Sequence, residues 1–289
     1  MPSGRLLVAG AALLWSLSGF FVKLLTEPPT WLGDLEPLAA PQIAVWRCLF
    51  GASMLLCFLQ PAAIRWHPLL PWMALSFAIM NGLFIFAMAA GDVASASLLQ
   101  YTAPFWVFLV NVLLLKRDQA NRRDWLALLV ATGGILIIVL GRWQASQLSP
   151  ALMALAAGLA FAGVLLCLSF LQSLQAGWLA FVNHAIAGLL ALPLAWNTPW
   201  PQGHQWVILA LFGMVQTGLP YWMMSRALHS VPSHEASLIT LLDPLCAPLW
   251  AYLVTYSIPS APTWMGGAVF LLALLLRYWP GSGKISAKP

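Results

Sequence analysis

Long apolar segments follow one another along almost the whole chain, and they limit the possible folds more than any other feature. Most contain about 20 residues, enough for a helix to cross the ~30 Å hydrocarbon core of a bilayer. Apolar residues make up 61% of the sequence and charged residues only 7%, so no segment remains for a separate soluble domain. We therefore predict an all-α polytopic membrane protein with about ten transmembrane helices. The predicted spans cover residues 6–25, 41–59, 71–90, 94–115, 125–140, 151–171, 178–196, 206–224, 236–256 and 264–278.

The two ends of the chain are both expected in the cytoplasm. The first apolar segment is longer than the core of a signal peptide and is not followed by a suitably spaced cleavage site, so we expect a retained span. Cytoplasmic loops of membrane proteins are rich in Lys and Arg. We therefore predict a protein of the inner (cytoplasmic) membrane, with Lys23, Arg142 and the acidic residues Glu27, Asp34 and Glu36 outside. The basic residues then inside are Arg5, Arg65, Lys116, Arg117, Arg122, Arg123, Arg226, Arg277, Lys284 and Lys288.

A short phrase occurs once in each half of the chain. Residues 96–99 read Ala-Ser-Leu-Leu and residues 236–239 read Ala-Ser-Leu-Ile, and Pro104 and Pro244 follow them at the same distance. Two aligned copies at this spacing indicate an internal duplication.

The duplication predicts how the two halves sit in the membrane. Each copy contains five predicted helices, and because five is odd the second copy enters the bilayer from the opposite side. We predict two inverted five-helix repeats, residues 1–143 and residues 144–289, the second ending in a short cytoplasmic tail. This architecture is typical of transporters that work by alternating access.

Further motifs accompany the two repeated helices, and together they resemble the drug/metabolite transporter superfamily, in particular its EamA-domain family with ten transmembrane helices. The resemblance extends over nearly the whole chain and implies a substrate site formed mainly by the first, third, fourth, sixth, eighth and ninth helices. The motifs that carry it are Leu13-Leu14-Trp15, Lys23, Arg47, the two Ala-Ser-Leu segments, Leu242-Asp243-Pro244, Pro259-Ser260 and Trp264-x-Gly266-Gly267.

The chain departs from the usual pattern of that family at three places. Members usually carry Gly-Glu just after the fourth and ninth helices, where this chain has Leu115-Lys116 and Tyr256-Ser257. The usual Leu-Glu-Pro has become Leu-Asp-Pro, which keeps the carboxylate but shortens its reach by one methylene. A role for the missing glutamates is therefore not expected here.

Asp243 is the only acidic residue that we place deep within a span. A charged aspartate at the centre of a membrane helix costs about 3 kcal/mol on insertion scales. One interpretation is a protonatable site that binds a substrate amine or carries a coupling proton. The other is structural, since Asp243 precedes Pro244 and its side chain is placed to cap a broken helix. The two interpretations are compatible.

Pro104 and Pro244 are both expected to kink their helices near the membrane midplane and so to line the substrate path. Two ionisable residues lie in the second and seventh spans. For Arg47 we favour a structural ion pair or a contact with the backbone over a transport role. For His184 we favour a neutral, hydrogen-bonded packing residue over a proton relay.

Polar and aromatic side chains at comparable depths are candidates for the substrate site. Amides and hydroxyls also join membrane helices structurally, by under ~1 kcal/mol each, and aromatic residues also serve helix packing, so both interpretations stay open. The candidate substrate-binding residues are Trp15, Asn81, Gln100, Tyr101, Gln216, Trp222, Thr240 and Asp243, with Asp243 also the candidate for proton coupling.

From these features we predict a secondary transporter of small metabolites, an exporter of amino acids or related compounds that works by alternating access around a midplane cavity. A proton is the candidate coupling ion. The alternatives are a lipid or head-group flippase and a membrane ligand-binding protein that does not transport. Catalytic motifs are absent, so we predict no enzymatic activity, cofactor, metal or nucleic-acid partner. The expected partners are a small-molecule substrate and the lipid bilayer, and both a monomer and a homodimer stay open.

Overall fold

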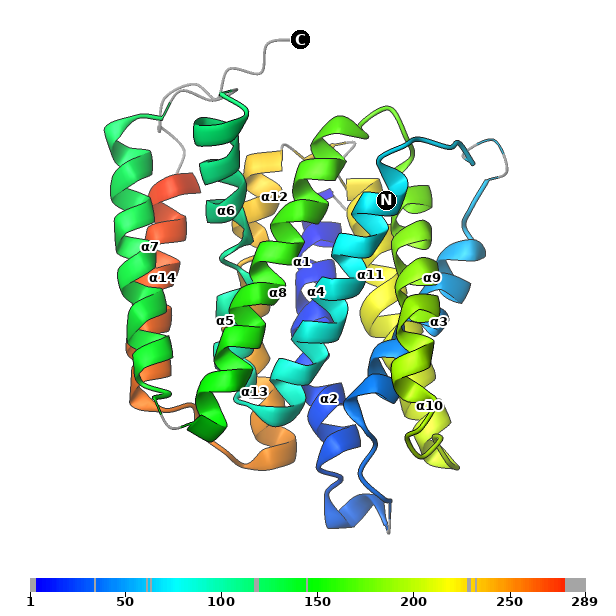
Figure 1. Cartoon of the computed structure of the whole chain (residues 1–289). Coiled ribbons are helices and arrows are strands. Elements are labelled where there is room, and N and C mark those ends of the chain that lie inside the picture. Colours follow the sequence, from blue (N-terminus) through cyan, green and yellow to red (C-terminus); the bar gives the residue numbers. More distant parts are fainter. Residues whose placement is uncertain are drawn as a thin grey trace.

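The computed structural model describes residues 4–33, 35–60, 62, 64–116, 120–143, 145–227, 230–231 and 233–278. These residues form helices joined by short connections, and none of them is in a β-strand (Figure 1). Several residues used in the orientation argument lie outside the described residues. They are Asp34, Arg117, and Lys284 and Lys288 in the predicted tail.

The helices before residue 143 group into five rods, three of them unbroken. The first and fourth rods are interrupted, and the fourth ends in a π-helical turn. A short 3₁₀ turn, η1 (Thr30–Leu32), follows the first rod. The rods are span 1 (α1, Gly4–Ser16, and α2, Ser18–Thr26), span 2 (α3, Ala40–Leu56), span 3 (α4, Leu70–Ala90), span 4 (α5, Val93–Gln100; α6, Ala103–Leu109; η3, Val110–Leu114) and span 5 (α7, Arg122–Leu140).

The described helices after residue 143 form five more rods. A π-helical segment lies in the middle of span 8, and span 9 is interrupted. The rods are span 6 (α8, Ala145–Phe170), span 7 (α9, Ala176–Ala195), span 8 (α10, His204–Leu211; η4, Phe212–Gly218; α11, Leu219–Ala227), span 9 (α12, Ser233–Ile239, and α13, Leu242–Thr255) and span 10 (α14, Ala261–Tyr278).

The rods have the length and composition of transmembrane helices. Within the described residues, seven helical rods are long and apolar enough to cross a membrane, and Ala40–Leu56 and Ala261–Arg277 are shorter apolar helices. Large apolar side chains such as Leu129 and Leu249 are more than half exposed on the outside of the bundle. In water such a surface would be costly, whereas lipid is a suitable solvent for it. The prediction of an all-α polytopic membrane protein is confirmed.

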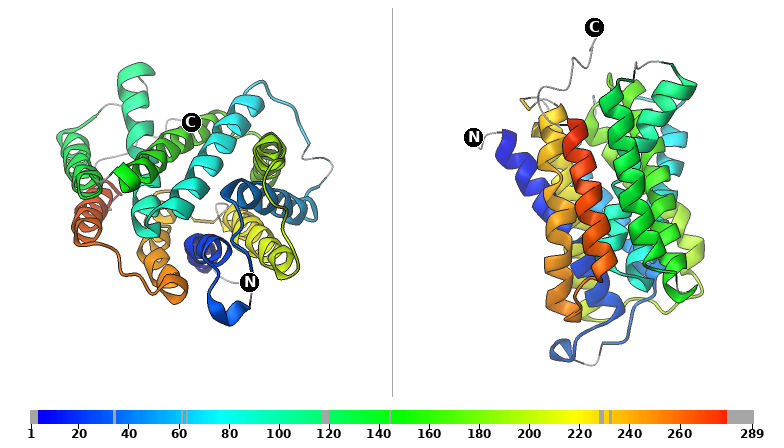
Figure 2. Two further views of the ribbon diagram at one scale, coloured as in Figure 1. Left: turned by 60° about the horizontal axis from the view of Figure 1, so that its bottom comes forward. Right: turned by 90° about the vertical axis from the view of Figure 1, so that its left-hand side faces the viewer.

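The rods stand side by side and span the height of the bundle (Figure 1, Figure 2). Spans 5 and 10 pack together at one edge, and spans 2 and 7 pack together near the other. Between them, span 3 packs along span 6, and span 1 contacts spans 8 and 9. The first helix begins and the last helix ends at the same end of the bundle, as an even number of crossings requires (Figure 1).

Proline explains why spans 4 and 9 are interrupted. Pro104 is the second residue of α6 and Pro244 the third residue of α13, and the interruptions lie just before them, at residues 101–102 and 240–241. Proline has no N–H and its ring clashes with the carbonyl four residues earlier, so it is tolerated in the first turn of a helix but not in its interior. Each span is therefore built from a shorter and a longer helical segment, α5 (8 residues) before α6 and η3 in span 4, and α12 (7 residues) before α13 (14 residues) in span 9.

Glycine lets spans 5 and 10 approach closely. A Cβ atom added at Gly134 would lie 2.7 Å from the carbonyl oxygen of Gly266, and one added at Gly266 would lie 2.6 Å from the carbonyl oxygen of Gly134. Phe270, one turn after Gly266 in span 10, also packs against Gly134. Close backbone approach at small residues is a typical basis of helix association in lipid.

This contact predicts opposite effects for two adjacent glycines. We expect Gly134→Ala to lower the thermal unfolding temperature of the detergent-purified protein, because the added methyl group must push two backbones apart. Gly133→Ala is the matched control, since a Cβ atom there has no neighbour within 4 Å, and alanine favours a helix by about 1 kcal/mol over glycine. Equal unfolding temperatures for the two variants would contradict the proposed packing.

Candidate functional site

Tyr101 joins the two interrupted spans near the middle of the bundle. Its side-chain oxygen lies 3.0 Å from the carboxylate oxygen Oδ2 of Asp243 and 3.0 Å from the carbonyl oxygen of Thr240. Tyr101 sits in the interruption of span 4, and Thr240 and Asp243 sit at the interruption of span 9. All three side chains are only partly buried. One phenol thus connects both breaks.

The chemistry of proline accounts for this connection. In a continuous helix the Thr240 carbonyl would accept a hydrogen bond from the residue four positions later, which is Pro244 and has no N–H. The carbonyl instead accepts from the backbone N–H of Asp243, 3.0 Å away, and shares the single hydroxyl proton of Tyr101 with the Asp243 carboxylate. An unpaired carbonyl is costly in the membrane interior, so the tyrosine satisfies a group that lipid would leave unpaired.

A third interruption lies in span 1 at Leu17, and no proline causes it. A serine lies on either side of it, and the Ser16 hydroxyl donates to the carbonyl of Leu13 at 2.7 Å. Serine side chains that bond to the preceding turn are known to bend helices. This break is not among those predicted from the sequence, although the Ser-x-Ser pattern of residues 16–18 in the middle of an apolar helix is a signal for it.

Side chains from spans 8 and 9 close the interruption of span 1. The amide of Gln216 donates to the carbonyl oxygen of Trp15 at 2.8 Å, and the indole N–H of Trp250 donates to the Ser16 hydroxyl at 2.8 Å. Gln216 lies in the π-helical segment η4, a feature frequent at functional sites. Trp15 also contacts Tyr221 edge-on, with ring centroids 5.2 Å apart.

The predicted site residues fall into three groups. Tyr101, Thr240 and Asp243 are brought together by hydrogen bonds, and Trp15 and Gln216 meet beside the break in span 1. Pro104, Pro244 and the partly buried Gln100 flank the interruptions.

Two candidates lie apart from these groups. Asn81 is buried between spans 2 and 3 and donates to the carbonyl oxygen of Ala44 at 3.2 Å. Trp222 packs on Phe58, with ring centroids 5.2 Å apart, and lies beneath the guanidinium of Arg226. These contacts are those of helix packing.

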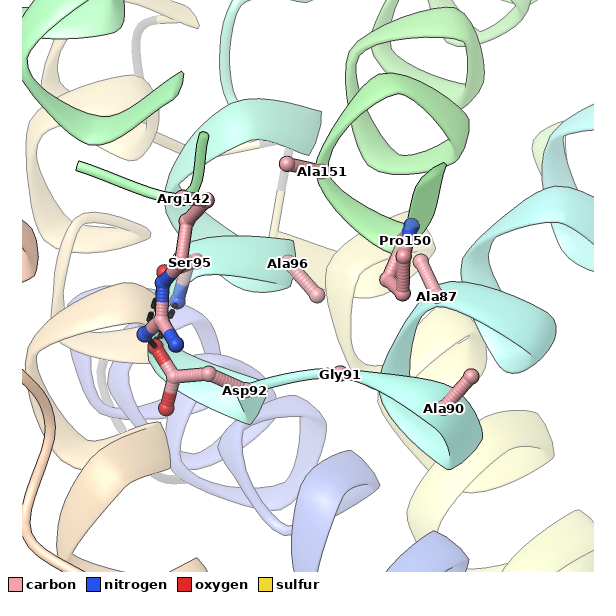
Figure 3. A pocket seen from close by; sticks show the side chains of 9 residues that line it. All are labelled: Ala87, Ala90, Gly91, Asp92, Ser95, Ala96, Arg142, Pro150 and Ala151. Carbon is pink, nitrogen blue, oxygen red and sulfur yellow. Dashed lines mark hydrogen bonds and ion pairs between the residues drawn. The ribbon is translucent and has the colours of Figure 1, made fainter. Parts of the chain in front are cut away.

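A second polar cluster lies where span 4 begins, and we call Asp92, Ser95, Arg142 and Thr263 the polar clasp. Figure 3 shows the first three of these residues. The Arg142 guanidinium is 2.8 Å from the carboxylate of Asp92 and 3.0 Å from the hydroxyl oxygen of Thr263. Asp92 also caps α5, accepting from the backbone N–H of Ser95 at 3.0 Å. The clasp ties together the ends of spans 4, 5 and 10.

A cavity of about 130 Å³ adjoins the polar clasp. Apolar side chains from spans 3 and 6, including Ala87 and Pro150, line its other side (Figure 3). Because the charged groups of the clasp already pair with one another, we interpret the clasp as a structural connection between helix ends.

Comparison with known proteins agrees with this architecture. The sequence profile of the EamA-like transporter family matches residues 2–140 and again residues 148–279. The chain belongs to the EamA-like transporter family. This EamA-like chain therefore transports small molecules across a cell membrane, and the resemblance seen in its motifs is confirmed.

Relatives of this EamA-like transporter align along nearly their whole length. It is 24% identical over 286 residues to the pseudopaline exporter CntI of Pseudomonas aeruginosa, covering 95% of each chain. It is 26% identical over 282 residues to the transporter YwfM of Bacillus subtilis, covering 94% of this chain and 92% of the other. A solved crystal structure shares the fold with a TM-score of 0.66 at 15% identity, over 94% of this chain and 96% of the other.

The polar clasp predicts a graded loss of stability. We expect Asp92→Ala to lower the unfolding temperature of the purified EamA-like transporter, because it removes a helix cap worth about 1 kcal/mol and the partner of a largely buried arginine. Asp92→Asn keeps a capping oxygen and removes only the charge, so its unfolding temperature should lie between that of Asp92→Ala and the wild type. Wild-type unfolding of Asp92→Ala in a thermal melt would refute the structural role of the clasp.

Proposed function

We propose that this transporter exports amino acids or related amine-bearing compounds by alternating access, with Asp243 and Tyr101 as the central contacts of the substrate. The observation that carries the proposal is the hydrogen bond between these residues, which joins the interruptions of two broken helices. Discontinuous helices at the membrane midplane are the usual building blocks of substrate sites in secondary transporters.

The carboxylate of Asp243 is suited to bind an ammonium group. Within the described part of the chain, no lysine, arginine or histidine forms an ion pair with it. A carboxylate buried in a membrane without a cation is costly, and a substrate ammonium would supply the missing charge. The Tyr101 hydroxyl would hold the carboxylate in place between transport cycles.

The packing of the spans supports two inverted halves, residues 1–143 and 144–289. Span 1 contacts spans 8 and 9, and span 6 contacts the corresponding spans 3 and 4. Span 2 packs on the π-helical segment of span 8, and span 7 packs on span 3. Exchanging spans 1–5 with spans 6–10 leaves this set of contacts unchanged. A pair of related halves that rock against each other would open the central site first to one side and then to the other.

The direction of transport is proposed to be outward. Support comes from the relative of Pseudomonas aeruginosa, which is named as an exporter and aligns with 95% of this chain.

The proposal predicts transport that depends on Asp243. In proteoliposomes, we expect counterflow uptake of a pooled, labelled mixture of amino acids and polyamines by the wild type. We expect a loss of at least about tenfold in Asp243→Asn, equivalent to ~1.4 kcal/mol of substrate interaction, and a smaller loss in Tyr101→Phe. Asp124→Asn is the matched control, because Asp124 lies at the start of α7 in its capping box. A folded protein without uptake of any member of the pool would refute the amine-bearing substrate.

Proton coupling through Asp243 is a separate proposal. Among the described residues, the titratable groups that interact with the carboxylate are Tyr101, Tyr221 and Cys246, none of which carries a charge near neutral pH in its usual state. A carboxylate that exchanges a substrate ammonium for a proton would drive export with the proton gradient.

Coupling predicts that Asp243→Asn loses concentrative transport driven by a pH gradient and keeps at most facilitated flux. The measurement is uptake against an imposed pH gradient compared with uptake at equal pH on both sides. If Asp243→Asn still concentrates substrate in a pH-dependent manner, Asp243 does not carry the proton.

A further inference from the structure

Arg47 is a buried arginine near the middle of span 2, and only 7% of its surface is exposed. Its Nη1 atom lies 3.3 Å from the hydroxyl oxygen of Ser18, and its guanidinium lies over the ring of Phe212, 5.1 Å from the centroid. No described residue forms a hydrogen bond with its Nε atom. Among the described residues, no carboxylate lies within ion-pair distance of this guanidinium.

These contacts are too weak to compensate the charge. A cation in the membrane interior costs several kcal/mol unless it is paired, and buried charges in proteins are generally paired with an opposite charge. A serine hydroxyl at 3.3 Å and a phenylalanine ring satisfy one N–H and part of the charge. The structural ion pair favoured for Arg47 from the sequence is not present among the described residues.

The packing around Arg47 holds it at this depth. A Cβ atom added at Gly213 of span 8 would lie 2.6 Å from the carbonyl oxygen of Arg47, so the two backbones are in close contact. A Cβ atom added at Gly51, one turn further along the same helix, would lie 3.2 Å from the Gly213 carbonyl oxygen. The helix is thereby fixed, and the guanidinium must find its partner in the interior of the bundle.

Tyr221 lies within electrostatic range of both Arg47 and Asp243. The phenol of Tyr221 interacts electrostatically with both of them, and its ring contacts Trp15 edge-on. Ser18, which accepts the hydrogen bond from Arg47, lies beside the interruption of span 1 at Leu17. Among the described residues, a cation without a carboxylate partner and a carboxylate without a cation partner thus both act electrostatically on the same aromatic side chain.

His184 lies near Tyr221 but cannot pair with the charge of Arg47, because an imidazole is either neutral or positively charged. Its Nδ1 atom lies 2.7 Å from the carbonyl oxygen of Ala180, which makes Nδ1 the donor and leaves Nε2 as an acceptor. Its ring lies between Phe77 and Tyr221, with centroids 4.6 Å and 4.8 Å away. A neutral imidazole in this position is a packing residue, in agreement with the interpretation favoured from the sequence.

We propose that Arg47 binds the carboxylate of the substrate while Asp243 binds its ammonium group, so that the substrates are zwitterions of the amino-acid type. This assignment rests on the proposed function, in which Asp243 binds the substrate ammonium, and adds a binding residue for the substrate carboxylate. Arginine is suited to the role because its planar guanidinium forms two parallel hydrogen bonds to one carboxylate. The carboxylate would take the unpaired Nε and replace the Ser18 hydroxyl as the acceptor of Nη1.

The first test compares substrates that differ only in the carboxylate. In proteoliposome counterflow, the labelled pairs are phenylalanine and phenethylamine, leucine and isoamylamine, and lysine and cadaverine. We expect the wild type to carry the amino acid of at least one pair about tenfold better than its amine, an ion-pair contribution of ~1.4 kcal/mol. Arg47→Met should reduce uptake of the amino acid to that of the amine and leave the amine unchanged, and Arg47→Lys should fall between. Arg65→Met, at an exposed loop arginine, should behave as the wild type.

The second test measures stability without transport. If Arg47 is an unpaired charge that awaits a ligand, Arg47→Met should unfold at or above the wild-type temperature in detergent, because replacing an uncompensated buried charge by an apolar side chain of similar size is neutral or stabilising. The same amino acids should raise the unfolding temperature of the wild type more than their amines do, and this difference should vanish in Arg47→Met.

The outcomes separate this inference from the proposed function. A wild type that carries the amines as well as the amino acids refutes the carboxylate subsite and leaves the Asp243 site intact. If Arg47→Met loses uptake of the amino acid and of its amine equally, Arg47 has a structural role. The same conclusion holds if Arg47→Met does not fold while Arg47→Lys keeps the full preference for amino acids. Stabilisation by amino acids that depends on Arg47, without any transport, supports the subsite and refutes the transport proposal.

Discussion

The hydrogen bond that proline cannot make is the constraint on which the centre of this transporter depends. Pro244 leaves the Thr240 carbonyl without its helical partner, and lipid offers no replacement. The Tyr101 hydroxyl lies within hydrogen-bond distance of that carbonyl and of the Asp243 carboxylate. A residue in the interruption of span 4 thus pairs a backbone group at the interruption of span 9. This contact places Tyr101 and Asp243 together inside an apolar bundle, where electrostatic interactions are stronger than in water.

The rest of the bundle is organised around the same problem of satisfying backbone groups away from water. Where span 1 breaks at Leu17, Gln216 pairs the Trp15 carbonyl and Trp250 pairs the Ser16 hydroxyl. At the edge of the bundle, where the helices are unbroken, Gly134 and its partner in span 10 allow close backbone contact. The interruptions of spans 1, 4 and 9 are thus closed by side chains of neighbouring spans, whereas spans 5 and 10 at the edge are regular helices.

Much of the candidate site was predictable from residue types and positions. Asp243 stood out because acidic residues are rare within spans, and Pro104 and Pro244 stood out because proline interrupts helices. Tyr101 was predicted as one of several aromatic candidates, and only its contact with Asp243 distinguishes it from Trp222, which packs on Phe58. These differences concern which face of a helix a side chain occupies, and apolar helices in lipid give almost no periodic signal from which to read the face.

The sequence by itself determined the class of the protein, its helical spans and the places where two of them break. These follow from length, hydropathy and proline, all of which act locally along the chain. Only the tertiary structure decided which side chains meet. The polar clasp of Asp92 and Arg142, the contacts of Gln216 and Trp250 at the break of span 1, and the burial of Arg47 without a carboxylate among the described residues all depend on residues far apart in the chain. Such contacts are selected by the packing of whole helices, and no local pattern encodes them.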